Sequence, residues 1–226
     1  MCVCVCVCVC VRACVRAAGE HDYETTQVFI MPAGDWTKRV SKAVMELGSR
    51  RHRSCWIRGP YTSPFTIAHD FSQLILFASG IGITPSLGVL GQYSGRRRVK
   101  FLIWATRSPS MLKFFAPLIG DAQVTTVYYT GKIHLSDAEI AEIQSHGQIF
   151  VHQRRPNLVE CFERTIVAFE SAALGDDRVT QASQIDAKIR ATWCALYCGG
   201  SPAIQNELAK AARKFGVGWQ AELFDW

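Results

Sequence analysis

Two glycine-rich turns are the segments of this sequence whose residue types and spacing best suit the binding of a reactive ligand. Gly80-Ile81-Gly82 follows an apolar run at residues 74–78, and Gly199-Gly200-Ser201-Pro202 follows another at residues 192–198. Glycine lets the backbone approach a pyrophosphate, and a helix that follows such a turn directs its free N–H groups at the anion. One Gly-x-Gly is a weak signal because many tight turns use it. Two such turns, each between an apolar run and a helix, favour a phosphate-bearing ligand.

An arginine supplies the second candidate for ligand recognition. Arg107 directly follows the apolar run at residues 99–106. In dinucleotide-binding folds, an acidic residue at the end of the second strand reads the 2′-hydroxyl of the adenine ribose, and an arginine there accommodates a 2′-phosphate instead. Arg107 therefore favours NADP(H) over NAD(H). A solvated arginine with no ligand is the alternative.

The elements that must position these residues alternate along the chain. Apolar, continuous strands that alternate with helices predict an α/β fold with an open parallel sheet and helices on both of its faces. Ligands bind beyond the carboxyl ends of the strands in such sheets, where both glycine turns and Arg107 lie. The pattern predicts strands at residues 74–78, 99–106, 123–129, 149–152, 192–198 and 217–224, helices at 85–93, 108–118, 158–172 and 203–215, and a surface loop at 175–187.

Composition excludes several other classes of protein. A hydrophobic content of 49% with 19% charged residues in a chain of 226 residues excludes a disordered protein. The net charge of +6 is too small for a dedicated nucleic-acid binder, so no nucleic-acid partner is expected. The six histidines show no metal-ligand spacing, and no metal site is predicted.

The first residues form a low-complexity tract. Residues 2–11 repeat Cys-Val five times, and six of the ten cysteines fall in the first fourteen residues. We interpret residues 1–19 as a disordered tail or a translated repeat. A thiol tail that binds metal and a secretory signal are the alternatives, although no basic residue precedes the apolar run as a signal peptide requires. The four remaining cysteines suit a reducing compartment and predict no disulfide partner.

One segment has the length of a short membrane span. Residues 74–91 carry no charge over eighteen positions, which is close to the minimum for a transmembrane helix. Four glycines and Pro85 interrupt the segment, so a strand, a turn and a helix explain it better. We expect no transmembrane segment in this chain.

Taken together, the motifs resemble the C-terminal NAD(P)H-binding domain of the ferric reductase and NADPH oxidase family, within the ferredoxin-reductase-like superfamily. The resemblance extends from about Val28 to Trp226, and the order of the motifs is more specific than any one of them. It is carried by segments 34–37, 59–61, 79–85, 101–107, 129–131, 155–157, 198–202 and 222–224.

The resemblance implies a domain organisation and a role for each matching residue. Residues 20–58 would be a remnant of the C-terminal end of an FAD-binding domain, and residues 59–226 the NAD(P)H-binding domain. The implied cofactor-binding residues are Gly80, Gly82, Thr84 and Pro85 for the pyrophosphate and nicotinamide side, Arg107, Arg155 and Pro156 for the 2′-phosphate, and Gly199 and Gly200 in the second turn. The implied catalytic residues are Cys198, beside the nicotinamide, and Phe224, stacked on the flavin.

The resemblance also implies an electron route from NADPH to FAD, and then singly through membrane haems to ferric iron or molecular oxygen. The flavin barrel would precede Val28, so the chain resembles a C-terminal fragment whose FAD site lies largely elsewhere. Its partners would be NADPH and the flavin and membrane haem domains, at the cytosolic face of a membrane. Two alternatives stay open: a non-catalytic nucleotide-binding or docking module, and one half of a soluble flavin-linked reductase.

Overall fold

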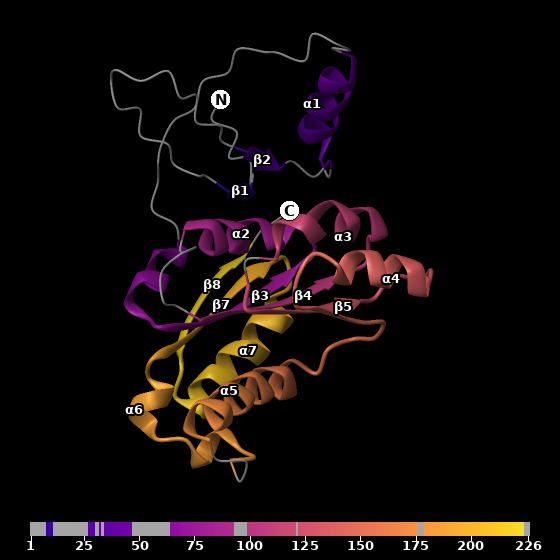
Figure 1. Ribbon diagram of the computed structural model, residues 1–226. Helices are drawn as coiled ribbons and strands as arrows, with labels where there is room; N and C mark the ends of the chain where they lie inside the picture. Colours follow the sequence, from indigo (N-terminus) through magenta and orange to yellow (C-terminus); the bar gives the residue numbers. More distant parts are fainter. Residues whose placement is uncertain are drawn as a thin grey trace, which may run out of the picture.

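A six-stranded sheet, in which all neighbouring strands are parallel, forms the centre of the protein. Its strand order is β6-β5-β4-β3-β7-β8 (Figure 1). The computed structural model describes residues 8–10, 27–29, 32, 34–46, 64–92, 99–120, 122–175 and 179–223. The strands are β3 (Gln73–Ser79), β4 (Val99–Thr106), β5 (Val124–Tyr129), β6 (Ile149–His152), β7 (Trp193–Gly199) and β8 (Gly218–Leu223).

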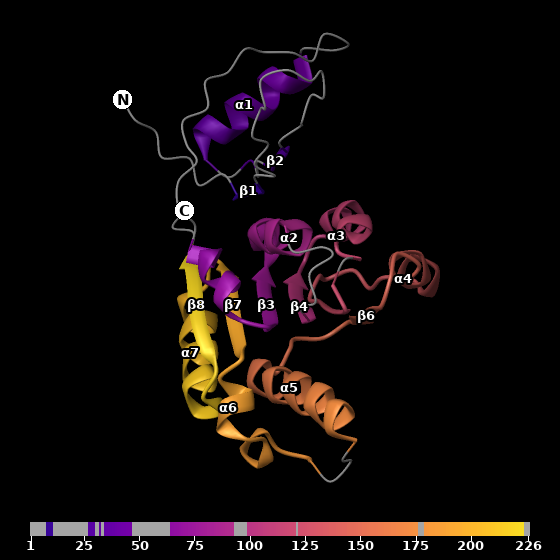
Figure 2. The ribbon, with the colours of Figure 1, turned by 60° about the vertical axis from the view of Figure 1, so that its left-hand side comes forward.

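Helices cover both faces of this sheet, as Figures 1 and 2 show. The chain first runs outward from β3 to β6 and then returns to place β7 on the other side of β3. Parallel crossovers are right-handed as a rule, so this reversal moves the connecting helices to the opposite face. One face carries α2 (Ile83–Gln92), α3 (Pro109–Phe115) and α4 (Asp137–Gln144), and the other carries α5 (Leu158–Leu174) and α7 (Pro202–Phe215). The predicted fold class is confirmed.

Both faces of the central strands are buried. In β3, Leu74 and Leu76 belong to the core under α2, α3 and α4, whereas Ile75 and Phe77 belong to the core over α5 and α7. All seven residues of β7 are buried. This double burial explains why the central strands are continuous apolar runs in the sequence.

The sequence predicted most elements closely and missed a few. The strands at 99–106 and 149–152 lie where they were predicted, and the ends of the other strands differ by at most one residue. Helix α4 was missed because only Ile140 and Ile143 give it apolar character. Its capping box, in which Ser136 and Glu139 each bond the other's backbone N–H, is the signal that could have found it. The predicted loop at 175–187 contains the short helix η4 (Ala182–Gln184) and the start of α6 (Ala187–Arg190).

The N-terminal part contains elements that the sequence did not predict. Strand β1 (Cys8–Cys10), within the dipeptide tract, pairs antiparallel with β2 (Gln27–Phe29). Helix α1 (Asp35–Glu46) begins directly after Gly34, and the 3-10 helix η1 (Pro64–Asp70) precedes β3. Segment 59–61, which carries part of the resemblance, lies outside the described residues, as does the rest of the dipeptide tract.

None of the helices in the described ranges is long and apolar enough to cross a membrane.

A buried hydrogen bond joins α5 to the central strand β7. The indole N–H of Trp193 donates to Glu170 Oε1 at 2.7 Å, and both side chains are buried. The Trp193 ring also stacks on Phe101 with a centroid distance of 5.8 Å. Trp193 therefore supplies both packing and the donor that compensates a buried carboxyl group.

We expect Trp193→Phe to lower the free energy of unfolding by about 2–4 kcal/mol, because it leaves a void and removes the donor from Glu170. Urea denaturation followed by circular dichroism measures this loss. Trp219→Phe, at a half-buried position of β8, is the matched control and should cost about 1 kcal/mol or less. Equal losses in the two variants would contradict a special role for the buried bond.

Candidate functional site

The two glycine turns lie side by side at the point where the strand order reverses. Strands β4, β5 and β6 lie on one side of β3, and β7 and β8 lie on the other. Strands β3 and β7 are neighbours, and Ala78 at the end of β3 pairs with Cys198 at the end of β7. The chain leaves β3 toward α2 on one face and leaves β7 toward α7 on the other (Figure 2). Such a switch point opens a crevice beyond the carboxyl ends of the strands, where ligands of open α/β sheets bind.

Gly82 makes the contact that brings the two turns together. A Cβ atom at Gly82 would overlap the carbonyl oxygen of Cys198 and would lie 2.7 Å from its carbonyl carbon and 3.1 Å from Gly199 Cα. Only glycine allows this approach of backbone to backbone. The other glycine of the first turn, Gly80, has a φ of +55°, which side chains disfavour. The structure therefore brings the first turn, with Gly80 and Gly82, close to Cys198 and Gly199.

Two side chains hold the first turn in shape. Trp104 Nε1 on the neighbouring strand donates to the Gly80 carbonyl at 2.9 Å. Thr84 Oγ1 donates to the Ile81 carbonyl at 3.2 Å, and its side chain is fully buried. Thr84, for which the resemblance implied a contact with the cofactor, thus supports the turn from within. Pro85, the next residue of α2, is half-buried.

A tyrosine that sequence reasoning missed organises the second turn. The Tyr197 hydroxyl lies 3.3 Å from Ser79 Oγ, and it accepts a bond from the Ser201 N–H at 3.4 Å. Burial raises the pKa of Tyr197, so its hydroxyl keeps its proton at neutral pH. A Cβ at Gly199 would lie 2.5 Å from that hydroxyl. Within a buried strand Tyr197 looks like ordinary core, and no pattern in the sequence marks it.

A glutamate of β8 lies beside the end of β7 in the sheet. Cys198 is fully buried, and its register partner on β8 is Glu222. Burial raises the pKa of Glu222 above its ordinary value. Gly200, the next residue of the second turn, is exposed. Phe224, the predicted flavin-stacking residue, lies outside the described residues.

The two predicted phosphate-reading arginines lie at the same edge of the sheet but on different turns. Arg107 follows β4 and Arg155 follows β6, and both side chains are exposed. Strand β5 separates β4 from β6 in the sheet, so the two turns are about 10 Å apart at the usual strand spacing. Pro156 is half-buried and precedes Asn157, which caps α5 by accepting the Glu160 N–H at 3.2 Å. One ligand that contacts both arginines must cross the end of β5.

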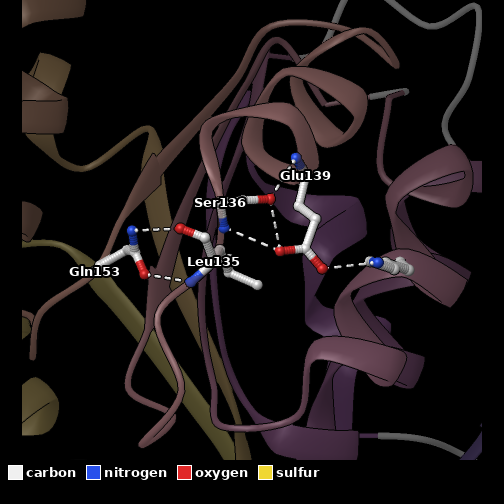
Figure 3. A network of polar contacts seen from close by, with 5 residues as sticks. Leu135, Ser136, Glu139 and Gln153 are labelled. Carbon is white, nitrogen blue, oxygen red and sulfur yellow. Dashed lines mark hydrogen bonds and ion pairs between the residues drawn. The ribbon is translucent and has the colours of Figure 1, made fainter.

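A polar network fixes the loops around this edge (Figure 3). The side-chain amide of Gln153, just after β6, accepts the Leu135 N–H at 2.7 Å and donates to the Leu135 carbonyl at 3.1 Å. Glu139 Oε2 accepts the N–H and the hydroxyl of Ser136, both at 2.9 Å. Its other oxygen lies 2.8 Å from Lys113 Nζ on α3. The network therefore ties α3, the loop before α4 and the end of β6 into one unit.

Comparison with known proteins identifies relatives for about half of the chain. No protein-family model matches it. NADPH oxidase 4 of Homo sapiens is 28% identical over 113 residues, which are 42% of this chain and 19% of that protein. Dual oxidase 1 of Homo sapiens is 24% identical over 130 residues, which are 53% of this chain and 8% of that protein. The chain resembles the NADPH oxidases. The resemblance inferred from the motifs is confirmed. The chain spans less than a fifth of the length of these relatives.

Solved structures show a weaker likeness. Flavohemoglobin of Malassezia yamatoensis with bound FAD and heme gives a TM-score of 0.36 at 17% identity, over 73% of this chain and 33% of that one. Ferredoxin-NADP+ reductase of Plasmodium falciparum gives a TM-score of 0.31 at 13% identity, over 74% of this chain and 57% of that one.

The contact at Gly82 predicts different costs for alanine at the two glycines of the first turn. Gly82→Ala should lower the free energy of unfolding by about 2–3 kcal/mol, because the new Cβ must push α2 away from the end of β7. Gly80→Ala should cost about 1 kcal/mol, since it meets only the backbone penalty of a positive φ and its Cβ has open space. Urea denaturation of both variants compares them, and a smaller loss for Gly82→Ala would contradict the close contact.

The network in Figure 3 predicts a dependence of stability on pH. The hydrogen bond from Lys113, followed by those from Ser136, lowers the pKa of Glu139 to about 2. An unfolded glutamate titrates at about 4.3, so the ionised form stabilises the fold above that pH and the contribution is lost as pH falls toward 2. The melting temperature of Glu139→Gln should lie below that of the wild type at pH 7, and the gap should narrow below about pH 4.

Glu207→Gln, which changes an exposed carboxyl group on α7, is the matched control and should melt with the wild type throughout. A gap for Glu139→Gln that stays constant down to about pH 3 would contradict the role of its charge.

Proposed function

We propose that this chain is the NADPH-binding dehydrogenase module of a flavin-dependent oxidoreductase. The observation that carries the proposal is the contact of Gly82 with the Cys198 carbonyl at the switch point. It brings the turn at the start of α2 and the end of β7 to one crevice, at the edge where open α/β sheets bind their ligands. The sequence similarity to NADPH oxidases supports the same conclusion.

The residues at this edge fit a dinucleotide phosphate. Gly80 has open space where a Cβ would lie, so the backbone of the turn can approach a pyrophosphate at the start of α2. Arg107 and Arg155 are exposed on the turns after β4 and β6, and a guanidinium group can bind a 2′-phosphate through paired N–H donors. Cys198, Gly199 and Gly200 would lie along the nicotinamide side. The cofactors supply hydride and electron transfer, and the role of this chain is to bind and orient NADPH.

The later steps of electron transfer would take place in the flavin and haem domains with which this chain associates. The names of the relatives support an oxidase, in which electrons pass from NADPH through FAD and haem to molecular oxygen; ferric iron is the alternative acceptor. The FAD site would lie largely outside this chain, with Phe224 stacked on the flavin. Residues 20–58 would end the FAD-binding domain and residues 59–226 would form the nucleotide domain, at the cytosolic face of a membrane, with residues 1–19 as a tail outside both.

The preference for NADPH over NADH tests this proposal. A charge-assisted hydrogen bond to a 2′-phosphate is worth about 1.5–3 kcal/mol, which NADH cannot gain because it presents a hydroxyl there. Arg107→Ala should therefore weaken NADPH binding by about tenfold to a hundredfold and leave NADH binding nearly unchanged. Arg155→Ala should act in the same direction to a smaller degree. Calorimetric titration of both nucleotides into the purified chain measures these constants.

Arg213→Ala, which removes an exposed arginine from α7, is the control for the loss of one positive charge. Equal losses for NADPH and NADH in Arg107→Ala would mean that the arginine supports its turn and does not read the phosphate. Absence of binding by either nucleotide to the folded wild type would overturn the proposed function itself.

A further inference from the structure

A cavity lies on the face of the sheet that carries α5, opposite to the face that carries α2. It has a volume of about 580 Å³ and lies between α5 and the part of the sheet formed by β5 and β6. Its lining begins at Gln123 and Gln148, directly before these two strands, and continues to Arg154, two residues after β6. The cavity therefore follows the whole length of β5, about 20 Å at 3.3 Å per residue.

The path of α5 explains why this space is open. Phe162 and Phe169 of α5 contact Phe77 of β3 and Phe101 of β4, with ring-centroid distances of 5.6 and 5.9 Å. Phe162 also contacts Phe215 of α7 at 5.4 Å. Helix α5 is thus held over the middle of the sheet, and β5 and β6 line the cavity beside it. Phe150 of β6, 53% exposed, forms part of its wall.

One end of the cavity is positively charged. Its lining includes Arg154, Arg155 and Arg164, against a single acidic residue, Glu160, which lies 3.5 Å from Arg164. Burial and then the charges of Arg154 and Arg164 lower the pKa of His152. The same two arginines act on Tyr128 and Cys161, so their charges reach one region of the cavity.

Two side-chain contacts shape the part of the cavity next to these arginines. The His152 ring stacks on Tyr128 with a centroid distance of 5.3 Å. The Tyr128 hydroxyl lies 2.9 Å from Cys161 Sγ on α5, which joins the floor of the cavity to its wall. Apolar side chains continue from there toward the amino ends of the strands. Concave sites of 300–1,000 Å³ with apolar linings and a few charged groups are typical of small-molecule binding.

We propose that this cavity binds an amphipathic organic anion. The apolar body lies along β5 and β6 against α5, and the carboxylate, sulfonate or phosphate is held by Arg154 and Arg164. The cavity shares Arg155 with the proposed dinucleotide site. Its apolar length extends away from the carboxyl edge of the sheet, and its anion is held by Arg154 and Arg164, so both ligands can bind at once. Binding in this cavity does not require NADPH, and the ligand does not occupy the position of NADPH at Arg107.

Fluorescence titration with anilinonaphthalene sulfonate, an apolar ring system with one anionic group, tests the site on the full chain. We expect saturable binding of one probe per chain, with the same affinity in the presence of saturating NADPH. Ala168→Trp and Ala172→Trp, which place an indole in the cavity from α5, should each abolish binding. Ala138→Trp, at an exposed position of α4, is the matched control and should bind as the wild type does.

The charge of the site is tested separately. Arg154→Ala and Arg164→Ala should each weaken binding of the sulfonate about tenfold, and Arg213→Ala should not. Phenylnaphthylamine, the same ring system without the sulfonate, should bind the wild type and the arginine variants equally. Thermal unfolding confirms that each variant is folded. The proposal is overturned if NADPH displaces the probe, if both tryptophan variants that fold still bind it, or if the two arginine variants bind it with unchanged affinity.

Discussion

The approach of α2 to the end of β7 is the constraint on which the rest of the structure depends. At Gly82 the backbone of one turn lies against the carbonyl group of Cys198 in the other, and no side chain fits between them. Trp104, Tyr197 and Thr84 then hold each turn from its own side. The geometry of the switch point is therefore determined by the backbone, and these side chains support its shape.

The architecture was largely readable from the sequence because β3 and β7 are buried on both faces. Such strands are unbroken apolar runs, and the helices between them carry caps or a periodic apolar face, as α7 does with Leu208, Ala212 and Phe215. Helix α4 escaped because few of its side chains reach the core, and its capping box was the stronger signal. Helix α1 was missed because the resemblance at residues 34–37 says little about the segment that follows.

The candidate site was predictable to the extent that its chemistry depends on glycine. Gly80, Gly82 and Gly199 occupy positions that a side chain would disturb, so their identities carry structural information. The roles of Tyr197 and Glu222 were not readable, because a tyrosine or glutamate in a strand has many ordinary uses and only the register with β3 and β7 gives these two a place at the site. Thr84 shows the reverse case: its position in the motif is as expected, but its hydroxyl bonds within the turn.

The pairing of β3 with β7 also determines when the switch point can form during folding. Ser79 and Tyr197, which meet there, are 118 residues apart in the chain, and contacts so distant in sequence form slowly because a long loop must close first. Strands β3 to β6 all precede β7 in the sequence, so half of the switch point is added only with β7 and α7. A chain that ends before β7 therefore lacks the close backbone contact at Gly82, however well its first four strands are formed.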